Sequence, residues 1–545
     1  MSESYRRLRE DLPTPPATGA FAAEPKKVKA WVAALPRANA QATEQALTQA
    51  LEQLLAQRLE GGQRAAALEE LRPAVVDSIA LLEGQYANNP LPLPTDKAQA
   101  AVAAERFHLL LAHGYRKAAV ELCAPAGSVP FLKGSAVLQS LHHAAWHYAR
   151  ALALAWRIYR PAAPGAWQGL HRVHRFAAEL RLDRKAVEDR LGGTGMDINT
   201  LYVQTLLVAA VNPYAFAQAE QDLLWPLARG YAARCGLASQ PPESGAPVVP
   251  DDADRGPGPG AGEQSHAHWL DLRAFADDVE RALTRVRDGH SELVPGPGQG
   301  VRVGNDLLRR LQRAFGQTAA RAMVRLPAGH RLDSVLGLSA VHYFLAGQRD
   351  FDTFMRQSAQ GNVHVIAGAA WTQVASAMTR VPRVAARVLD QSLGGYRMTW
   401  ASAEQARARV GELVGLGFGD GDESDWMVGV MRWLRYEVDG SLSAGVELLA
   451  RRATPVALRV VGPDGEARHV GRAVEVFAID GSSGRRFVAN AAIESGCRVE
   501  VIHDAMTASP ELAGRGPDVL GDVEVLLNAG DYYLIGERST ADLAA

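Results

Sequence analysis

The chain has 545 residues, of which 47% are hydrophobic and 22% charged, a globular composition long enough for several domains. Lysine and arginine number 58 against 60 aspartate and glutamate residues, so the net charge of -2 provides no global attraction to a nucleic-acid polymer or an anionic membrane. Cys123, Cys235 and Cys497 are odd in number and far apart, which argues against a disulfide framework or a zinc ribbon and favours a reducing cytoplasm.

The first half of the chain has a helical period. Residues 1–24 form a polar tail without the apolar core of a signal peptide. Over residues 25–237 apolar side chains recur at i, i+3 and i+4, as at Leu71, Val75 and Ile79. We therefore expect an all-α domain, and because its apolar stretches are too short to span a bilayer, we expect no membrane insertion.

Two histidine pairs in this domain have metal-like spacing. His143 and His147 are four residues apart, and His171 and His174 are three apart. Because no H-E-x-x-H signature and no cysteine at ligand spacing accompany them, we expect no metal, and the rival interpretation as a metal-dependent hydrolase lacks ligands. Neither a Ser-His-Asp nor a paired-carboxylate frame can be assembled, so we expect no enzyme and no cofactor.

The middle of the chain changes composition. Residues 238–264 are rich in proline, glycine and acidic residues, which predicts a linker because such a segment cannot bury enough apolar surface. Residues 265–317 form a helical lead-in, with amphipathic patterns over 270–286 and 306–315.

Residues 318–450 alternate in the manner of β-strands, with an insertion over about 348–378. The strand-like runs cover residues 332–344, 384–389, 396–400, 410–416, 426–436 and 442–449. Further β-type runs, including 456–461, fall within residues 451–545 and predict a small β-rich domain, either a second barrel or an extension of the first sheet.

Two motifs in this region can hold a polar ligand. Asp390, Ser392 and Gly395 lie at a sharp turn between two strands, where a carboxylate, a hydroxyl and bare amides stay exposed. Arg321 and Arg325, four residues apart, offer two planar guanidinium groups suited to a molecule with two phosphates.

A second arginine pair, Arg383 and Arg387, lies within the strand that enters the turn. Residues four apart on an extended strand point to the same face and lie along the sheet. We therefore expect this pair to take no part in the ligand site.

The order R-x-x-x-R, strand, D-x-S-x-x-G and later strands resembles that of PilZ domains, small β-barrels that bind the bacterial second messenger cyclic di-GMP. The resemblance implies that Arg321 and Arg325 clamp phosphates and guanines, while Asp390, Ser392 and Gly395 receive a guanine edge and backbone.

For the whole chain the resemblance implies a cytoplasmic bacterial signalling protein that binds cyclic di-GMP and modulates a protein partner through the helical domain. The alternative is a ligand-independent scaffold with a degenerate barrel, which the long insertion favours.

Overall fold

The computed structural model divides into two compact units, residues 1–322 and 323–545, and each is considered separately. The residues that it describes are 2–13, 20–87, 89, 91–189, 191, 193–240, 246–258, 268–287, 289–296, 298–319, 325–358, 381–406, 408–418, 426–478, 484–491, 493, 496–504 and 518–537.

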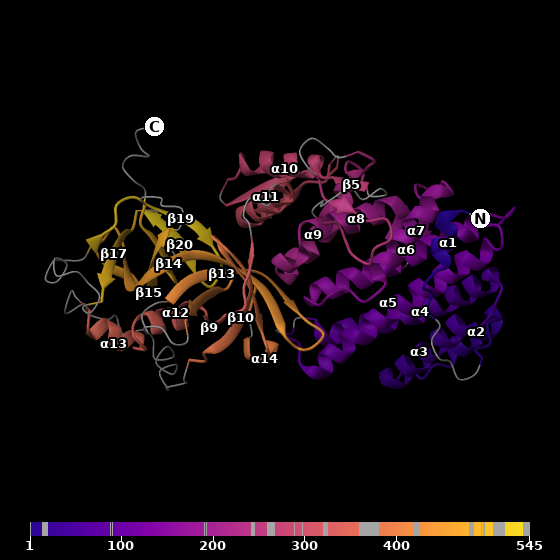
Figure 1. The fold of residues 1–545 in the computed structure, drawn as a ribbon, viewed down its shortest axis with the longest axis horizontal. Helices are drawn as coiled ribbons and strands as arrows, with labels where there is room; N and C mark the ends of the chain where they lie inside the picture. The colour runs from indigo at the N-terminus through magenta and orange to yellow at the C-terminus, as the bar shows by residue number, and fades with distance from the viewer. Residues whose placement is uncertain are drawn as a thin grey trace. The chain divides into compact units, whose positions relative to one another are not determined.

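The first unit is mainly helical, as the sequence predicts (Figure 1). Its helices are α1 (Glu3–Arg9), α2 (Pro25–Ala33), α3 (Ala40–Ala56), α4 (Gly61–Tyr86), α5 (Thr95–Leu122), α6 (Gly134–Arg157), α7 (Ala166–Glu179), α8 (Ile198–Ala210), the short 3-10 helix η1 (Pro213–Ala215), α9 (Gln218–Tyr231), α10 (Arg273–Leu283) and α11 (Asn305–Ala319).

The long helices α4, α5 and α6 pack side by side, and their apolar faces form one continuous core. Leu71 and Val75 on α4 and Leu111 on α5 are each fully buried, which explains their helical spacing in the sequence. Asparagine and aspartate cap the N-termini of two of the helices. Asn39 Oδ1 accepts a hydrogen bond from the amide of Ala42 in α3. Asp197 Oδ1 accepts one from the amide of Thr200 in α8.

Short strands complete the first unit. They are β1 (Val187–Asp189), β2 (Gly193–Met196), β3 (Gly236–Ala238), β4 (Val248–Val249), β5 (His268–Asp271), β6 (His290–Leu293) and β7 (Val301–Gly304). Strands β3 and β4 both pair with β5.

Residues 246–258 of the predicted linker lie against helix α7. Asp254 accepts hydrogen bonds from the amides of Gly165 and Trp167, and Asp252 receives the guanidinium of Arg172, with 2.5 Å between Nε and Oδ1. These contacts hold the acidic segment 246–258 on α7. The predicted domain boundaries stay a prediction.

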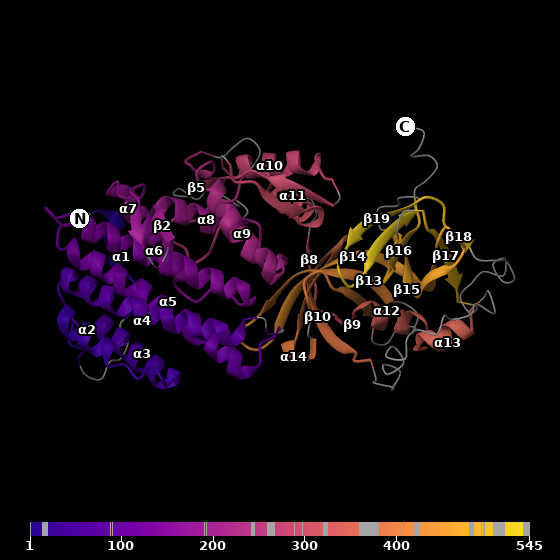
Figure 2. The same cartoon turned by 180° about the vertical axis from the view of Figure 1, so that it is seen from behind.

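The second unit is built on antiparallel strands (Figure 2). They are β8 (Leu326–Pro327), β9 (Arg331–Leu336), β10 (Val384–Ser392), β11 (Gly395–Trp400), β12 (Leu413–Gly417), β13 (Trp426–Tyr436), β14 (Leu442–Val461), β15 (Ala467–Ala478), β16 (Arg486–Ala489), β17 (Arg498–His503), β18 (Asp518–Val519), β19 (Val523–Asn528) and β20 (Tyr533–Glu537). Among its described residues, this unit has the helices α12 (Leu338–Leu345), α13 (Phe351–Arg356) and α14 (Ala403–Ala406).

A closed barrel forms in the order β11-β10-β9-β12-β13-β14, because β11 pairs with β14 as well as with β10. Alternate residues of β11 point inward, so that Tyr396, Met398 and Trp400 are buried while the residues between them are partly exposed. The predicted barrel strands are therefore confirmed, with one exception.

The exception is the run 332–344, which the sequence pattern predicts as a single strand. Strand β9 ends at Leu336, Gly337 adopts a positive φ of 82°, and Leu338–Leu345 forms helix α12. The helix buries Phe344 against Trp426, with ring centroids 4.9 Å apart, and so covers an apolar part of the barrel. A short run that is rich in apolar residues does not distinguish a buried strand from a buried helix, which is why the prediction of a single strand was wrong.

Strand β14 joins the barrel to the C-terminal strands. Its first half pairs with β11 and β13, and its second half pairs with β15 and β17. The β-rich region after residue 450 is therefore an extension of the same sheet, with its own core around Leu458, Phe487 and Val501. Among the helices of the described residues, none combines the length and apolarity that a bilayer crossing requires.

Candidate functional site: a strand hairpin with an arginine pair

The D-x-S-x-x-G motif forms a tight hairpin between β10 and β11. Ser392 and Gly395 are paired across it, and only Leu393 and Gly394 lie in the turn. The carbonyl of Gly394 accepts a hydrogen bond of 2.9 Å from the amide of Leu448 on β14, which fixes the turn against the barrel. The Ser392 hydroxyl donates a long bond of 3.4 Å to the carbonyl of Gly395 and keeps part of its surface exposed.

Strand β8 brings the predicted arginine to this hairpin. Pro327 and Leu326 pair with Asp390 and Gln391 of β10, so Arg325 directly precedes the paired residues. Its Nη1 lies 2.7 Å from Oδ1 of Asp390, with the Arg325 side chain 56% and the Asp390 side chain 22% exposed. Arg321 lies outside the described residues.

The second arginine pair is placed differently. Arg383 binds the carboxylate of Asp333, with 3.0 Å between Nε and Oδ2, and its guanidinium lies over the rings of Phe344 and Trp426. Arg387 is exposed on the barrel face, opposite Arg331 in the β9–β10 register. Of the described arginines in the two pairs, Arg325 therefore contacts Asp390 of the hairpin, whereas Arg383 forms an ion pair with Asp333 away from the hairpin.

Arg397 is a further site residue that the sequence argument missed. It is the cross-strand partner of Asp390, and its Nη1 lies 3.9 Å from Oδ2 of that carboxylate. Its Nε is buried and has no hydrogen-bond partner among the described residues. The signal was present in the sequence, because counting outward from a two-residue turn at Leu393 and Gly394 pairs Asp390 with Arg397.

Gly395 has a packing role in this hairpin. A Cβ atom at Gly395 would come within 2.1 Å of the carbonyl oxygen of Val446 on β14, closer than any side chain permits. Gly445 is similar, because a Cβ there would lie 2.1 Å from Nε1 of Trp433. The glycines therefore allow β11 and β13 to approach β14, and the predicted contact of Gly395 with a ligand stays a prediction.

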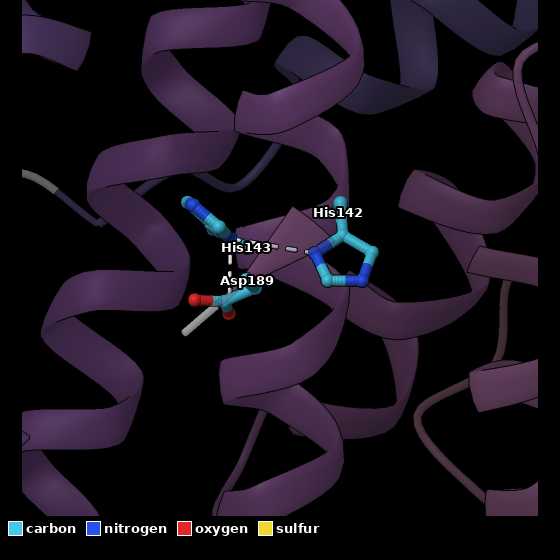
Figure 3. Close-up of side chains that lie close together, drawn as sticks. All are labelled: His142, His143 and Asp189. Carbon is cyan, nitrogen blue, oxygen red and sulfur yellow. Dashed lines mark hydrogen bonds and ion pairs between the residues drawn. The ribbon is translucent and has the colours of Figure 1, made fainter. Parts of the chain in front are cut away.

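The histidines of the helical unit form a different cluster. His142, His143 and Asp189 bring ligand-type atoms within 4.8 Å of one another, and all three are buried (Figure 3). Arg72 donates to both oxygens of Asp189, at 2.8 Å from Nη1 and 2.5 Å from Nη2. Burial alone would raise the pKa of Asp189, but the bonds from Arg72 outweigh it and lower that pKa to about 2.

A permanent cation already neutralises this carboxylate, so the cluster suits a buried ion pair better than a metal ion. His147 joins the same network through Arg72. His171 and His174 lie on α7 and contact Tyr202, with His171 Nδ1 2.6 Å from the Tyr202 hydroxyl.

Comparison with known proteins agrees with this architecture. Residues 26–243 match the family model described as the N-terminal domain of the cyclic-di-GMP receptor FimW. Residues 260–380 and 360–455, two overlapping segments, match the model of the middle PilZ domain of FimW.

A curated relative is similar along most of its length. The cyclic-di-GMP receptor FimW of Pseudomonas aeruginosa is 25% identical over 520 residues, which cover 87% of this chain and 84% of the relative. No solved structure matches. This chain therefore contains a PilZ domain and is similar to FimW in having an N-terminal domain that is followed by that PilZ domain.

Proposed function

We propose that this chain is a cytoplasmic receptor for cyclic di-GMP and that the ligand binds the outer face of the barrel at β8, β10 and β11. The observation that carries the proposal is the 2.7 Å contact of Arg325 with Asp390, because it joins the R-x-x-x-R segment to the D-x-S-x-x-G hairpin. The name of the Pseudomonas relative, a cyclic-di-GMP receptor, supports the choice of ligand.

The chemistry of the face suits such a ligand. A guanidinium group binds a phosphate through two parallel hydrogen bonds, and a carboxylate accepts bonds from the N–H groups of a guanine edge. Arg325 and Asp390 supply these two groups, and the partly exposed guanidinium of Arg397 lies beside Asp390. Arg331, exposed on the neighbouring strand β9, adds positive charge for an anion.

Ligand binding must separate Arg325 from Asp390 or engage the pair as a unit. Separation costs little, because an ion pair as exposed as this one stabilises a fold by about 1 kcal/mol or less. The free energy gained from the new charge-assisted hydrogen bonds to phosphate and guanine then exceeds the free energy lost with the Arg325–Asp390 ion pair.

In this proposal the receptor acts as an effector that alters how the helical domain meets a protein partner. A ligand shifts a conformational equilibrium only by its differential affinity for the two states, so the partner must distinguish the bound receptor from the free one. The alternative is a ligand-independent scaffold. The observation that favours the scaffold is that the Asp390 carboxylate already has an ion-pair partner, Arg325, without a ligand.

Calorimetric titration of the full chain with cyclic di-GMP tests the proposal. We expect saturable binding that weakens in Asp390→Ala and Arg325→Ala. The matched control is Arg468→Ala, which removes an exposed arginine that pairs with Asp464 on the C-terminal strands. Absence of binding by the unmutated protein, or equal loss in the control, favours the scaffold.

A further inference from the structure

The helical unit has a groove of about 610 Å³ between the start of α3, the second half of α4 and the start of α5 (Figure 1). Its wall on α4 consists of Ala74, Asp77, Ser78, Leu81, Leu82 and Gln85. These residues recur at i, i+3, i+4, i+7, i+8 and i+11, so one face of α4 runs along the groove for about 16 Å, or about three turns. The groove includes none of the residues of the arginine pairs or of the barrel hairpin.

The floor of the groove is apolar, and its hydroxyl groups are already bonded. Leu82 is 6% exposed. The buried hydroxyl of Thr43 donates to the carbonyl of Pro36 at 2.9 Å. The buried hydroxyl of Ser78 donates to the carbonyl of Ala74 at the same distance. The floor therefore presents apolar surface, unlike a small-molecule pocket in which polar groups converge on the ligand.

The edge of the groove combines one exposed leucine with exposed amides. Leu81 is 62% exposed, so a partner that covers it removes apolar surface from water. The glutamines at the edge are Gln41, Gln45, Gln85 and Gln99, all of them exposed. Their amides contain donors as well as acceptors and so accommodate varied polar side chains. An apolar centre with a polar rim is the usual composition of a protein–protein interface.

The charge at the groove favours a cationic partner. Glu44, Asp77 and Asp96 line it, against the single guanidinium of Arg37. Asp96 is 72% exposed and lies 3.5 Å from Lys97. Among the described residues, the carboxylates of Glu44 and Asp77 have no ion-pair partner. A partner that brings positive charge to them gains electrostatic complementarity without breaking an existing ion pair.

We propose that this groove binds an amphipathic, basic helix of a partner protein. The apolar face of that helix lies on Leu81 and Leu82, and its lysine or arginine side chains lie beside Glu44 and Asp77. Helices bind such grooves through apolar side chains at i, i+3, i+4 and i+7, a spacing that the three-turn wall of α4 accommodates. The inference rests on the proposed function in one respect, since it gives the chemistry of the protein partner of the helical domain.

Fluorescence anisotropy of a labelled peptide, titrated with the full chain, tests the assignment. The probe is an amidated helical peptide of leucine and lysine, about four turns long, with leucine at i, i+3, i+4 and i+7. We expect saturable binding that weakens as the salt concentration rises, because salt screens the attraction between lysine and the exposed carboxylates. The peptide in which glutamate replaces every lysine should not bind.

Exposed residues of the groove can be changed without disturbing the core. Leu81→Ser should weaken binding of the lysine peptide about tenfold, because the apolar contact is lost. Asp77→Asn and Glu44→Gln should each weaken it severalfold and reduce its salt dependence. The matched controls are Val102→Ser and Asp277→Asn, at exposed positions outside the groove, and they should leave the affinity unchanged.

Three results would overturn the proposal. The first is absence of saturable binding by the lysine peptide, and the second is equal binding of the glutamate peptide or an equal loss in the control variants. The third is a dimer of the unmutated protein, measured by light scattering, that dissociates in Leu81→Ser, because the groove would then bind a second copy of this chain. All peptide titrations omit cyclic di-GMP, so their failure leaves the receptor proposal standing, and failure of the cyclic di-GMP titration leaves peptide binding at the groove standing.

Discussion

Gly395 and Val446 lie so close across the β11–β14 pair that a Cβ atom on Gly395 would be 2.1 Å from the Val446 carbonyl oxygen. This pair of strands closes the barrel, so the close approach at Gly395 links the geometry of the hairpin to the stability of the fold. The obstruction is backbone, which cannot move aside as a flexible side chain can.

Gly395→Ala should therefore destabilise the barrel by about 1 to 3 kcal/mol, the usual cost of overpacking. Urea unfolding followed by tryptophan fluorescence of the two variants and the unmutated protein measures the change. Gly329→Ala is the matched control, because a Cβ there meets nothing within 4 Å. Equal stability of the two variants would show that β11 can shift away from β14.

Arg325→Ala should weaken cyclic di-GMP binding by roughly ten- to a hundredfold, the value of a lost charge-assisted bond of about 1.5 to 3 kcal/mol. Arg387→Ala should have a much smaller effect, because Arg387 lies beside Arg331 rather than at the turn. The melting temperature of Arg325→Ala should change little, since its ion pair is half exposed. Calorimetry decides the assignment, and equal losses or a loss confined to Arg387→Ala would reject it.

The Asp189 carboxyl should make the helical unit sensitive to strong acid. Its pKa is about 2 in the fold against 3.8 in the unfolded chain, so its stabilising effect is complete above about pH 4 and is lost as the pH falls towards 2. The loss amounts to about 2 kcal/mol. Urea unfolding at several pH values, followed by helical circular dichroism, measures it.

Asp189→Asn should remove this acid dependence and lower stability at neutral pH by about 3 to 5 kcal/mol, because Arg72 is left buried without its counter-ion. The control is Asp222→Asn, whose ion pair with Arg157 is exposed. An acid profile that Asp189→Asn leaves unchanged would contradict the role given to Asp189.

His142 should make the same unit sensitive to mild acid. Burial, together with the neighbouring His143, lowers the pKa of His142 to about 4 from 6.5. The unfolded chain therefore binds more protons between pH 6.5 and 4, and stability falls across that window by up to about 1.4 kcal/mol per pH unit. His142→Gln should reduce the slope of this profile, to which other buried histidines such as His108 and His147 also contribute, whereas His290→Gln, at an exposed position, should not.

Limited proteolysis tests the predicted linker at residues 238–264. We expect cleavage within this segment, and we expect Arg172→Ala to accelerate it, because Arg172 binds Asp252 and helps to hold residues 246–258 on α7. Peptide mapping of the first cuts provides the measurement. First cleavage inside α4–α6 or the barrel strands, in either protein, would contradict the boundary.

The sequence alone determined the local elements and the candidate hairpin. The helical period placed the long helices, and the Asp390 motif with its glycines placed a turn between strands that the structure has as β10 and β11. These features are readable because side-chain period and turn chemistry depend on neighbours in the chain.

Tertiary structure decided what depends on distant partners. The sequence pattern predicts two separate runs, 442–449 and 456–461, yet β14 runs unbroken from Leu442 to Val461 because β15 and β17 pair with its second half. The run after Gly337 became helix α12 because its apolar side chains cover the barrel. The meeting of Arg325 with Asp390 depends on the β8–β10 pairing across 65 residues, which no local pattern specifies.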